Sequence, residues 1–355
     1  MGSPEVKLKL KSHLAKIVDV ATDLNEVSLY WQKFWTLPTS VDDIVAVFLP
    51  CDIRYIRDNH RSAFTKLIHS ITNRLIYLTK LKNFPSANFP YIELLNCIRL
   101  LTVILPFLYE KPSLLFIEND VFWNRIYRTP FYSSHRAFHE NISSDTAYSD
   151  VSGLDGSVHP RPDSGVALDN TVGITHQDTE RHEKPVGSEL IDSCLDLLFT
   201  SEFTVENTKD RNQNSNFANV NQLTVWEPGY EAKGLYQDPK LKYDSNRLEI
   251  VRFLLVLFSR NMYCLPSSVV KVGSRFLTYF VSATNGRKYY ILCLSLLNTL
   301  LRSLQSNGDK ARVNEFSDPE HKNNNGLEVP DENHKKIRIL MVTNAIQLFT
   351  LMIAY

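Results

Sequence analysis

The sequence has little glycine, and it has no surplus of charge of either sign. Only 12 glycines occur in 355 residues, which disfavours the glycine-rich loops that cradle phosphates in nucleotide-binding enzymes. The 39 Lys and Arg residues balance 39 Asp and Glu residues, so the basic surplus typical of nucleic-acid-binding proteins is missing. We therefore expect no nucleic-acid partner and no cofactor.

Cysteine is also scarce, and its spacing excludes two further classes. The five cysteines are odd in number, far apart and never arranged as CxxC, so neither a disulfide framework nor a structural zinc site is indicated. Most of them, Cys97 among them, lie in or beside apolar runs, where a reduced thiol packs as a small hydrophobic group. No early apolar run resembles a secretory signal, and we therefore expect a cytosolic protein.

Catalytic motifs are missing as well. The sequence has no GxxxxGK[ST], no GxGxxG after a strand, no GxSxG, no HExxH and no Cys/His ligand set. His135 and His139 stand four residues apart, but no metal-binding frame surrounds them. We predict a protein that is not an enzyme, with no catalytic, cofactor-binding or metal-binding residues. A site assembled from scattered residues stays open as an alternative.

What the sequence does contain is apolar spacing typical of helices. Residues 6–20 place apolar side chains on one helical face, and residues 91–109 are apolar nearly all round. Arg99 and Pro106 interrupt the second run, which favours a core helix over a membrane span. Thr39 or Ser40 is expected to cap one helix, and Ser188 a later one.

Polar stretches divide the chain into segments. We predict a first helical segment over residues 1–131, a disordered insertion over 132–186, a second helical segment over 187–304 with an irregular tract at 205–243, a polar linker over 305–334, and an apolar helix over 335–355. The insertion is rich in Ser, Asp, Gly and Pro and cannot bury enough surface to offset its ordering entropy. Successive helices without a convincing strand predict an all-α fold of stacked antiparallel helices, a divergent α-solenoid of the armadillo or HEAT kind.

Five stretches of the chain resemble, in order, the high-temperature-induced dauer formation protein family, which is related to dymeclin. They are WQKFWTLPTSVDDIVAVFLPCDIRYIRDN, LLNCIRLLTVILPFLYE, SELIDSCLDLLFTSEFTV, WEPGY and SNRLEIVRFLLVLFSRNMY. The resemblance extends over about residues 28–300. Members of the family are considerably longer, so the chain resembles their N-terminal part, as a fragment or a truncated gene model.

The resemblance implies a function without catalysis. It implies a cytosolic protein, peripheral on the Golgi and trans-Golgi network, that acts in vesicle-mediated transport and protein sorting. We expect a scaffold with protein partners, peripheral contact with Golgi membranes and no small-molecule substrate. The alternative is a soluble helical-repeat adaptor that tethers a cytosolic enzyme, such as a ubiquitin-pathway protein, at the Golgi.

The first eleven residues, MGSPEVKLKLK, raise the question of a lipid anchor. Some members of the family carry an N-terminal myristoyl group, which makes Gly2 the candidate acceptor. Val6 departs from the myristoylation pattern, which has a small hydroxyl residue at that position. One myristoyl chain binds bilayers only marginally, with an association constant on the order of 10⁴ M⁻¹, so a second signal is needed.

Basic residues near the N-terminus are candidates for that second signal. Four lysines are expected to contact an anionic membrane surface: Lys7, Lys9, Lys11 and Lys16. Each would contribute roughly 1 kcal/mol near an anionic leaflet. The same lysines can equally form the solvated side of an ordinary first helix.

The C-terminal run Ile339–Tyr355 offers a rival anchor, because it is mostly apolar and basic residues precede it. It is shorter than the ~20 apolar residues that span a bilayer, and it contains Asn344 and Gln347. We favour a core helix of a truncated array over a tail anchor.

Overall fold

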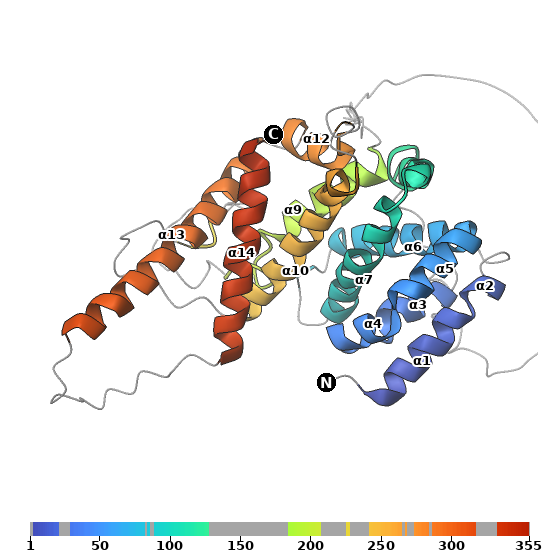
Figure 1. The fold of residues 1–355 in the computed structure, drawn as a ribbon, viewed down its shortest axis with the longest axis horizontal. Coiled ribbons are helices and arrows are strands. Elements are labelled where there is room, and N and C mark those ends of the chain that lie inside the picture. The colour runs from blue at the N-terminus through green and yellow to red at the C-terminus, as the bar shows by residue number, and fades with distance from the viewer. Residues whose placement is uncertain are drawn as a thin grey trace, which may run out of the picture. The chain divides into compact units, whose positions relative to one another are not determined.

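The computed structural model describes residues 3–20, 29–81, 84–85, 89–127, 184–206, 225–227, 241–264, 267, 273–283, 286–316 and 332–354. For residues 20 and 304–316 it describes the backbone alone. Within these ranges the regular secondary structure is helical, with isolated β-bridges but no strand (Figure 1). The predicted all-α class is confirmed, and the solenoid arrangement stays a prediction. Most of the expected insertion at 132–186, together with Gly2, lies outside the described residues.

The first half of the chain folds into short helices followed by two long ones. They are α1 (Pro4–Ala15), α2 (Ile17–Val20), α3 (Leu29–Thr36), α4 (Val41–Val47), α5 (Pro50–Asn59), α6 (Arg61–Thr79) and α7 (Tyr91–Tyr109). After α7 come a 3₁₀ turn (Pro112–Leu114), α8 (Leu115–Glu118) and a π-helical turn (Asn119–Trp123).

The second half is built from longer helices. They are α9 (Val186–Leu197), α10 (Leu241–Phe258), a 3₁₀ helix (Ser259–Tyr263), α12 (Arg275–Ser282), α13 (Gly286–Phe316) and α14 (Glu332–Ala354). α14 packs along α10 and α13, and Figure 1 shows the red α14 beside the gold α10 and the orange α13.

Local sequence signals set several helix ends. Ser40 caps α4 in a capping box, in which its hydroxyl accepts from the Asp43 amide at 3.3 Å and the Asp43 carboxylate accepts from the Ser40 amide at 3.1 Å. Pro50 opens α5 at its first turn, where the missing amide hydrogen costs nothing. The predicted cap at this site is thus confirmed as Ser40.

Other boundaries differ from those predicted. α9 begins at Val186 with Pro185 at its N-cap position, and Ser188 is a buried residue within the helix instead of its cap. A Cβ on Gly187 would lie 3.1 Å from the Phe122 carbonyl oxygen, so glycine permits the close approach of α9 to the π-helical turn. The local sequence does not reveal this tertiary contact.

The flanks of the predicted polar linker are helical. α13 continues to Phe316, beyond the expected end of its segment at residue 304, and α14 begins at Glu332 instead of residue 335. The first predicted helix is also divided, because α1 ends at Ala15 and α2 follows after Lys16. The polar composition that predicted a linker therefore does not prevent helical backbone at either flank.

α7 lies at the centre of the helices around it. It packs against α3, α4, α5, α6 and α10, and apolar side chains along its length are fully buried. α7 and α14 are long and apolar enough to cross a membrane by composition, but the most apolar window of α7 is 56% buried within the protein. The predicted core helix at residues 91–109 is confirmed, and Arg99 within it reaches Glu249 of α10 at 3.4 Å.

The outer face of α14 differs from that of α7. Met341, Ala345 and Leu348 are buried against the protein, while Ile339 and Ile346 are 65% and 50% exposed. The most apolar window of α14 is only 22% buried. One face of α14 is thus packed as expected for a core helix. That the other face is covered in a longer chain stays a prediction.

A buried amide joins α7 to the turn between α3 and α4. The Asn96 side chain is fully buried, and its Nδ2 donates to the carbonyl oxygens of Trp35 at 3.0 Å and Pro38 at 2.7 Å. These carbonyl groups lie in the last turn of α3 and just beyond it, and the Asn96 amide replaces the water that would otherwise hydrate them. Asn96 therefore sets how the N-terminal helices sit on α7.

Replacing Asn96 by Leu should destabilise the protein without changing its helix content. The substitution leaves two buried carbonyl groups without a donor, and we expect the free energy of unfolding to fall by about 2–4 kcal/mol. Urea unfolding followed by circular dichroism measures the change. Asn59→Leu is the control, because Asn59 is at an exposed helix end and donates only to the Tyr55 carbonyl. Equal effects of the two substitutions would contradict this role for Asn96.

Candidate functional site

The structure places the four predicted membrane-contact lysines on two different sides of the first helix. Leu10 and Leu14 of α1 are buried against the protein. Because a helix turns ~100° per residue, Lys7 and Lys11 fall on one flank of this buried face, and Lys9 and Lys16 fall on the opposite flank. The four lysines thus form no single patch.

A third lysine joins Lys9 and Lys16 at a surface pocket between α1 and α3. The pocket has a volume of about 410 Å³, and its lining is Leu8, Lys9, Ser12, His13, Lys16, Lys33 and Leu37. Lys33 belongs to α3 and is exposed. Neither Lys33 nor His13 is among the site residues predicted from the sequence. The one available signal was that Lys33 is the single cation within the aromatic run YWQKFW.

His13 forms the floor of this pocket and fixes its two walls to each other. Its Nε2 lies 2.8 Å from the Tyr30 carbonyl oxygen, and the Tyr30 hydroxyl donates to the His13 carbonyl oxygen at 2.7 Å. A carbonyl only accepts, so Nε2 carries the proton. Burial lowers the pKa of His13, and the nearby charges of Lys33 and Lys16 lower it further, which keeps the ring neutral at pH 7.

A second polar cluster includes Trp226 and Glu227, which lie in the tract that the sequence predicts to be irregular. The Glu227 side chain is only 1% exposed, and its two oxygens accept from both terminal nitrogens of Arg338 at 2.6 and 2.7 Å. Thr299 of α13 donates to the same carboxylate at 3.0 Å. Asp244 of α10 accepts from Arg338 at 3.2 Å and from Arg247 at 2.9 Å. One short segment is thereby tied to α10, α13 and α14.

The tryptophan of the same segment is also held by polar and cationic contacts. Trp226 donates its indole hydrogen to the Leu198 carbonyl at 2.8 Å, and the Arg247 guanidinium lies 5.1 Å from the ring centre. Arg247 also donates to the Thr204 carbonyl at 2.7 Å. The sequence did not predict this cluster, because its members lie far apart in the chain. We assign it a structural role, since each charge is paired with an opposite charge.

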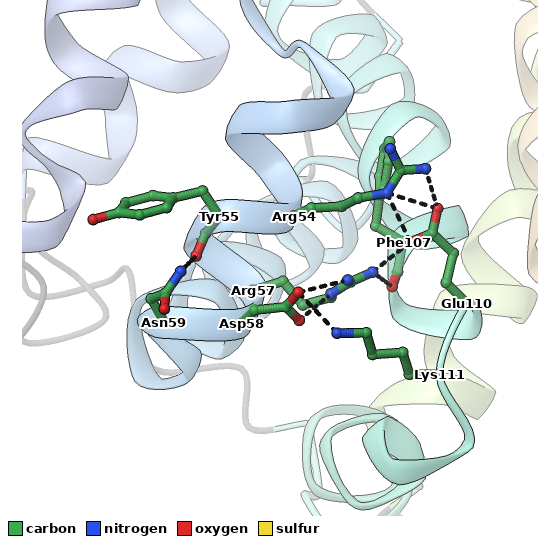
Figure 2. Close-up of polar contacts among 8 residues, drawn as sticks. All are labelled: Arg54, Tyr55, Arg57, Asp58, Asn59, Phe107, Glu110 and Lys111. Atoms are coloured by element: carbon green, nitrogen blue, oxygen red, sulfur yellow. Dashed lines mark hydrogen bonds and ion pairs between the residues drawn. The ribbon is translucent and has the colours of Figure 1, made fainter.

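A third cluster is at the end of α7 (Figure 2). The Arg57 side chain is 2% exposed, and it donates to the Phe107 carbonyl at 3.0 Å and to Glu110 at 2.5 Å. Lys111 points toward Asp58 and donates to it at 2.8 Å. Arg57 thus satisfies a carbonyl group at the C-terminal end of α7 and joins that end to α5.

The third cluster is unsuited to acid–base catalysis near neutral pH. Hydrogen bonds from Arg57 and Lys111 hold the pKa of Asp58 well below its usual range. The pKa of Glu110 is lowered by its hydrogen bond to Arg54, with a further contribution from Arg57. Both carboxylates are therefore charged and paired, and neither is poised to exchange a proton at pH 7.

The cysteines and metal-ligating residues give no catalytic arrangement in the described part of the chain. Burial raises the pKa of the Cys97 and Cys194 thiols, which keeps both protonated and unreactive. Among the residues with known positions, no group of three or more His, Cys, Asp or Glu side chains is placed to hold a metal ion.

Replacing Arg338 by Met should show how strongly the second cluster holds α14. The substitution leaves the buried Glu227 carboxylate without its cation, and we expect the free energy of unfolding to fall by about 3–5 kcal/mol. Lys336→Met, at an exposed position on the same helix, should change it by less than about 0.5 kcal/mol. Chemical denaturation of each variant measures both. A loss for Arg338→Met no larger than for Lys336→Met would show that the network does not hold α14.

The fold and these clusters define an all-α protein whose buried charges join neighbouring helices. The comparison with known proteins then identifies the family. The whole chain, residues 1–355, matches the High-temperature-induced dauer-formation protein family, and the protein belongs to it. The resemblance stated from the sequence is confirmed.

Three relatives show how far the similarity extends. The chain is 30% identical over 336 residues to the Ubp5-interacting protein ftp105 of Schizosaccharomyces pombe, an alignment that covers 85% of this chain and 35% of the relative. It is 25% identical to Protein HID1 of Mus musculus and 24% identical to Protein HID1 of Homo sapiens, over 84% of this chain and 32% of each relative. The chain thus spans about a third of the length of these relatives. No solved structure matches it.

Proposed function

We propose that the protein is a non-enzymatic scaffold that associates peripherally with Golgi and trans-Golgi membranes and acts in vesicular trafficking and protein sorting. The match of the whole chain to the High-temperature-induced dauer-formation protein family carries the proposal. The described polar clusters support it, because their charges are paired between helices and present no arranged nucleophile and base. Packed helices of this kind offer broad surfaces to protein partners.

The N-terminus provides the membrane contact in this proposal. A myristoyl group on Gly2 would enter the bilayer, and Lys9 and Lys16, which share one flank of the first helix, would lie against an anionic leaflet. The acyl chain alone binds marginally, so both signals are required for stable attachment. Leu8 of α1 is 70% exposed, which fits a helix whose outer side contacts a membrane.

A second candidate function is an adaptor that tethers a cytosolic enzyme, such as a ubiquitin-pathway protein, at the Golgi. The observation that favours it is the name of the fission-yeast relative, which describes that protein as interacting with Ubp5. The two functions differ in what their loss changes. Loss of a sorting scaffold missorts secretory cargo generally, whereas loss of an adaptor displaces only the tethered enzyme.

Replacing Gly2 by Ala should release the protein from membranes. Alanine at this position cannot be myristoylated, so a myristate analogue should label the wild-type protein and leave the variant unlabelled. We expect the wild-type protein to pellet with Golgi membranes and the variant to move to the soluble fraction. Ser3→Ala is the control, because it leaves Gly2 in place. A wild-type protein that stays soluble and unlabelled would contradict this attachment and favour the adaptor.

A further inference from the structure

We propose that the pocket between α1 and α3 binds the phosphorylated headgroup of an inositol lipid, through Lys9, Lys16 and Lys33. The inference rests on the proposed membrane association and adds to it the class of lipid recognised. The shared chemistry is a cluster of phosphate groups on a small polar ring, which a soluble inositol phosphate also presents.

The positive charges of the pocket come from three separate places in the chain. Lys9 belongs to α1, Lys16 follows its last turn, and Lys33 belongs to α3. All three lysines line the same pocket, and the charges of Lys16 and Lys33 lower the pKa of His13, which also lines it. Three ammonium groups around one cavity suit a ligand that carries several negative charges.

Acidic groups do little to neutralise this site in the part of the chain that the structure describes. The described lining contains no Asp or Glu side chain. Glu5 accepts from Lys9 at 2.6 Å, but both side chains are largely exposed, so this pair is weak and easily exchanged for a phosphate. Asp19 does not line the pocket, and its charge contributes to the raised pKa of Tyr30.

The pocket also has the size and the donors that a phosphorylated ring requires. Its volume of about 410 Å³ falls within the usual range for small-molecule sites, ~300–1,000 Å³. Ser12 contributes a hydroxyl group beside the lysines, and phosphate oxygens accept charge-assisted hydrogen bonds from such donors. The reciprocal hydrogen bonds between His13 and Tyr30 hold α1 and α3 together, so the walls are in place before a ligand arrives.

The apolar residues at the pocket favour a lipid over a free inositol phosphate. Leu8 lines the pocket and is 70% exposed, and Leu37 lines it from the end of α3. A headgroup held by the lysines would bring Leu8 to the boundary between headgroups and acyl chains, where its side chain leaves water. A soluble inositol phosphate would leave Leu8 exposed. The site thus combines headgroup recognition with shallow insertion.

The helix itself offers a matched control. Lys16 and Lys33 line the pocket, whereas Lys7 and Lys11 lie on the opposite flank of α1. Lys16→Ala/Lys33→Ala and Lys7→Ala/Lys11→Ala each remove two positive charges near the N-terminus. A difference in membrane binding between these two double variants therefore reflects the position of the lysines at the pocket and not the loss of net charge.

Vesicle co-sedimentation of the full chain without its acyl group tests the proposal. Three vesicle types are used: phosphatidylcholine alone, phosphatidylcholine with phosphatidylserine, and phosphatidylcholine with a phosphatidylinositol phosphate at matched surface charge. We expect the phosphoinositide vesicles to bind most tightly. The Lys16→Ala/Lys33→Ala variant should weaken that binding by about 25-fold, or about fivefold per lysine, and the Lys7→Ala/Lys11→Ala variant by less than about threefold.

Three further measurements separate the outcomes. Lys16→Arg/Lys33→Arg should retain binding, and thermal unfolding should be unchanged in all three variants. A soluble inositol phosphate should compete with the vesicles for the wild-type protein. Equal losses of binding in the two alanine variants would contradict headgroup recognition by the pocket. Equal binding of the wild-type protein to both kinds of anionic vesicle would contradict it as well. If the protein binds the soluble inositol phosphate but not the vesicles, the ligand of the pocket is the soluble compound and not a lipid.

The assay is independent of Gly2, because the chain carries no acyl group. A failed vesicle experiment would therefore leave a Gly2-dependent Golgi association standing. A wild-type protein absent from Golgi membranes in cells would contradict the proposed function even if the vesicles bind.

Discussion

The pairing of buried charges is the constraint on which the arrangement of helices depends. A charge removed from water is strongly destabilising unless an opposite charge or several hydrogen bonds replace the solvent. Here the partners lie on different segments of the chain. Buried Glu118 of α8 pairs with Arg260, buried Glu227 pairs with Arg338 of α14, and half-buried Arg99 of α7 pairs with Glu249 of α10. Each pair can form only when two segments far apart in the sequence are correctly packed.

Apolar burial alone would specify this packing poorly. Helices such as α7 are apolar around most of their surface, so many rotations and shifts bury similar areas. A single polar side chain within such a helix restricts the alternatives. Asn96 does this where α3 and α4 meet α7, and Arg57 of α5 has the same effect from outside by donating to a carbonyl group at the end of α7. Polar groups thus select one arrangement from those that the hydrophobic effect permits.

The parts of the structure that the sequence predicts well are those fixed locally. The helix at residues 91–109 and the cap at Ser40 follow from composition and from a short capping pattern. The close approach of Gly187 in α9 to the carbonyl group of Phe122 is different, because it joins two segments that are far apart in the sequence. Sequence patterns along one helix carry no information about such contacts between helices.

The candidate site shows the same division. Lysines of α1 are visible in the sequence as a basic run, but their separation onto two flanks follows from the buried face of the helix. Lys33 enters the site only because His13 and Tyr30 join α1 to α3. Gly2 lies outside the described residues, so the acyl anchor rests on the sequence and the family.

The central claim, that the pocket side of α1 faces the membrane, is tested most directly by site-specific fluorescence. A cysteine in place of Leu8 carries an environment-sensitive dye, in a chain with the accessible Cys51, Cys264 and Cys293 changed to Ser. The same dye on a cysteine in place of Ile346, on the outer face of α14, is the comparison. We predict a blue shift at position 8 on addition of phosphoinositide-containing vesicles and no shift at position 346. A shift at position 346 with none at position 8 would contradict the account, because α14 would then be the helix that enters the membrane.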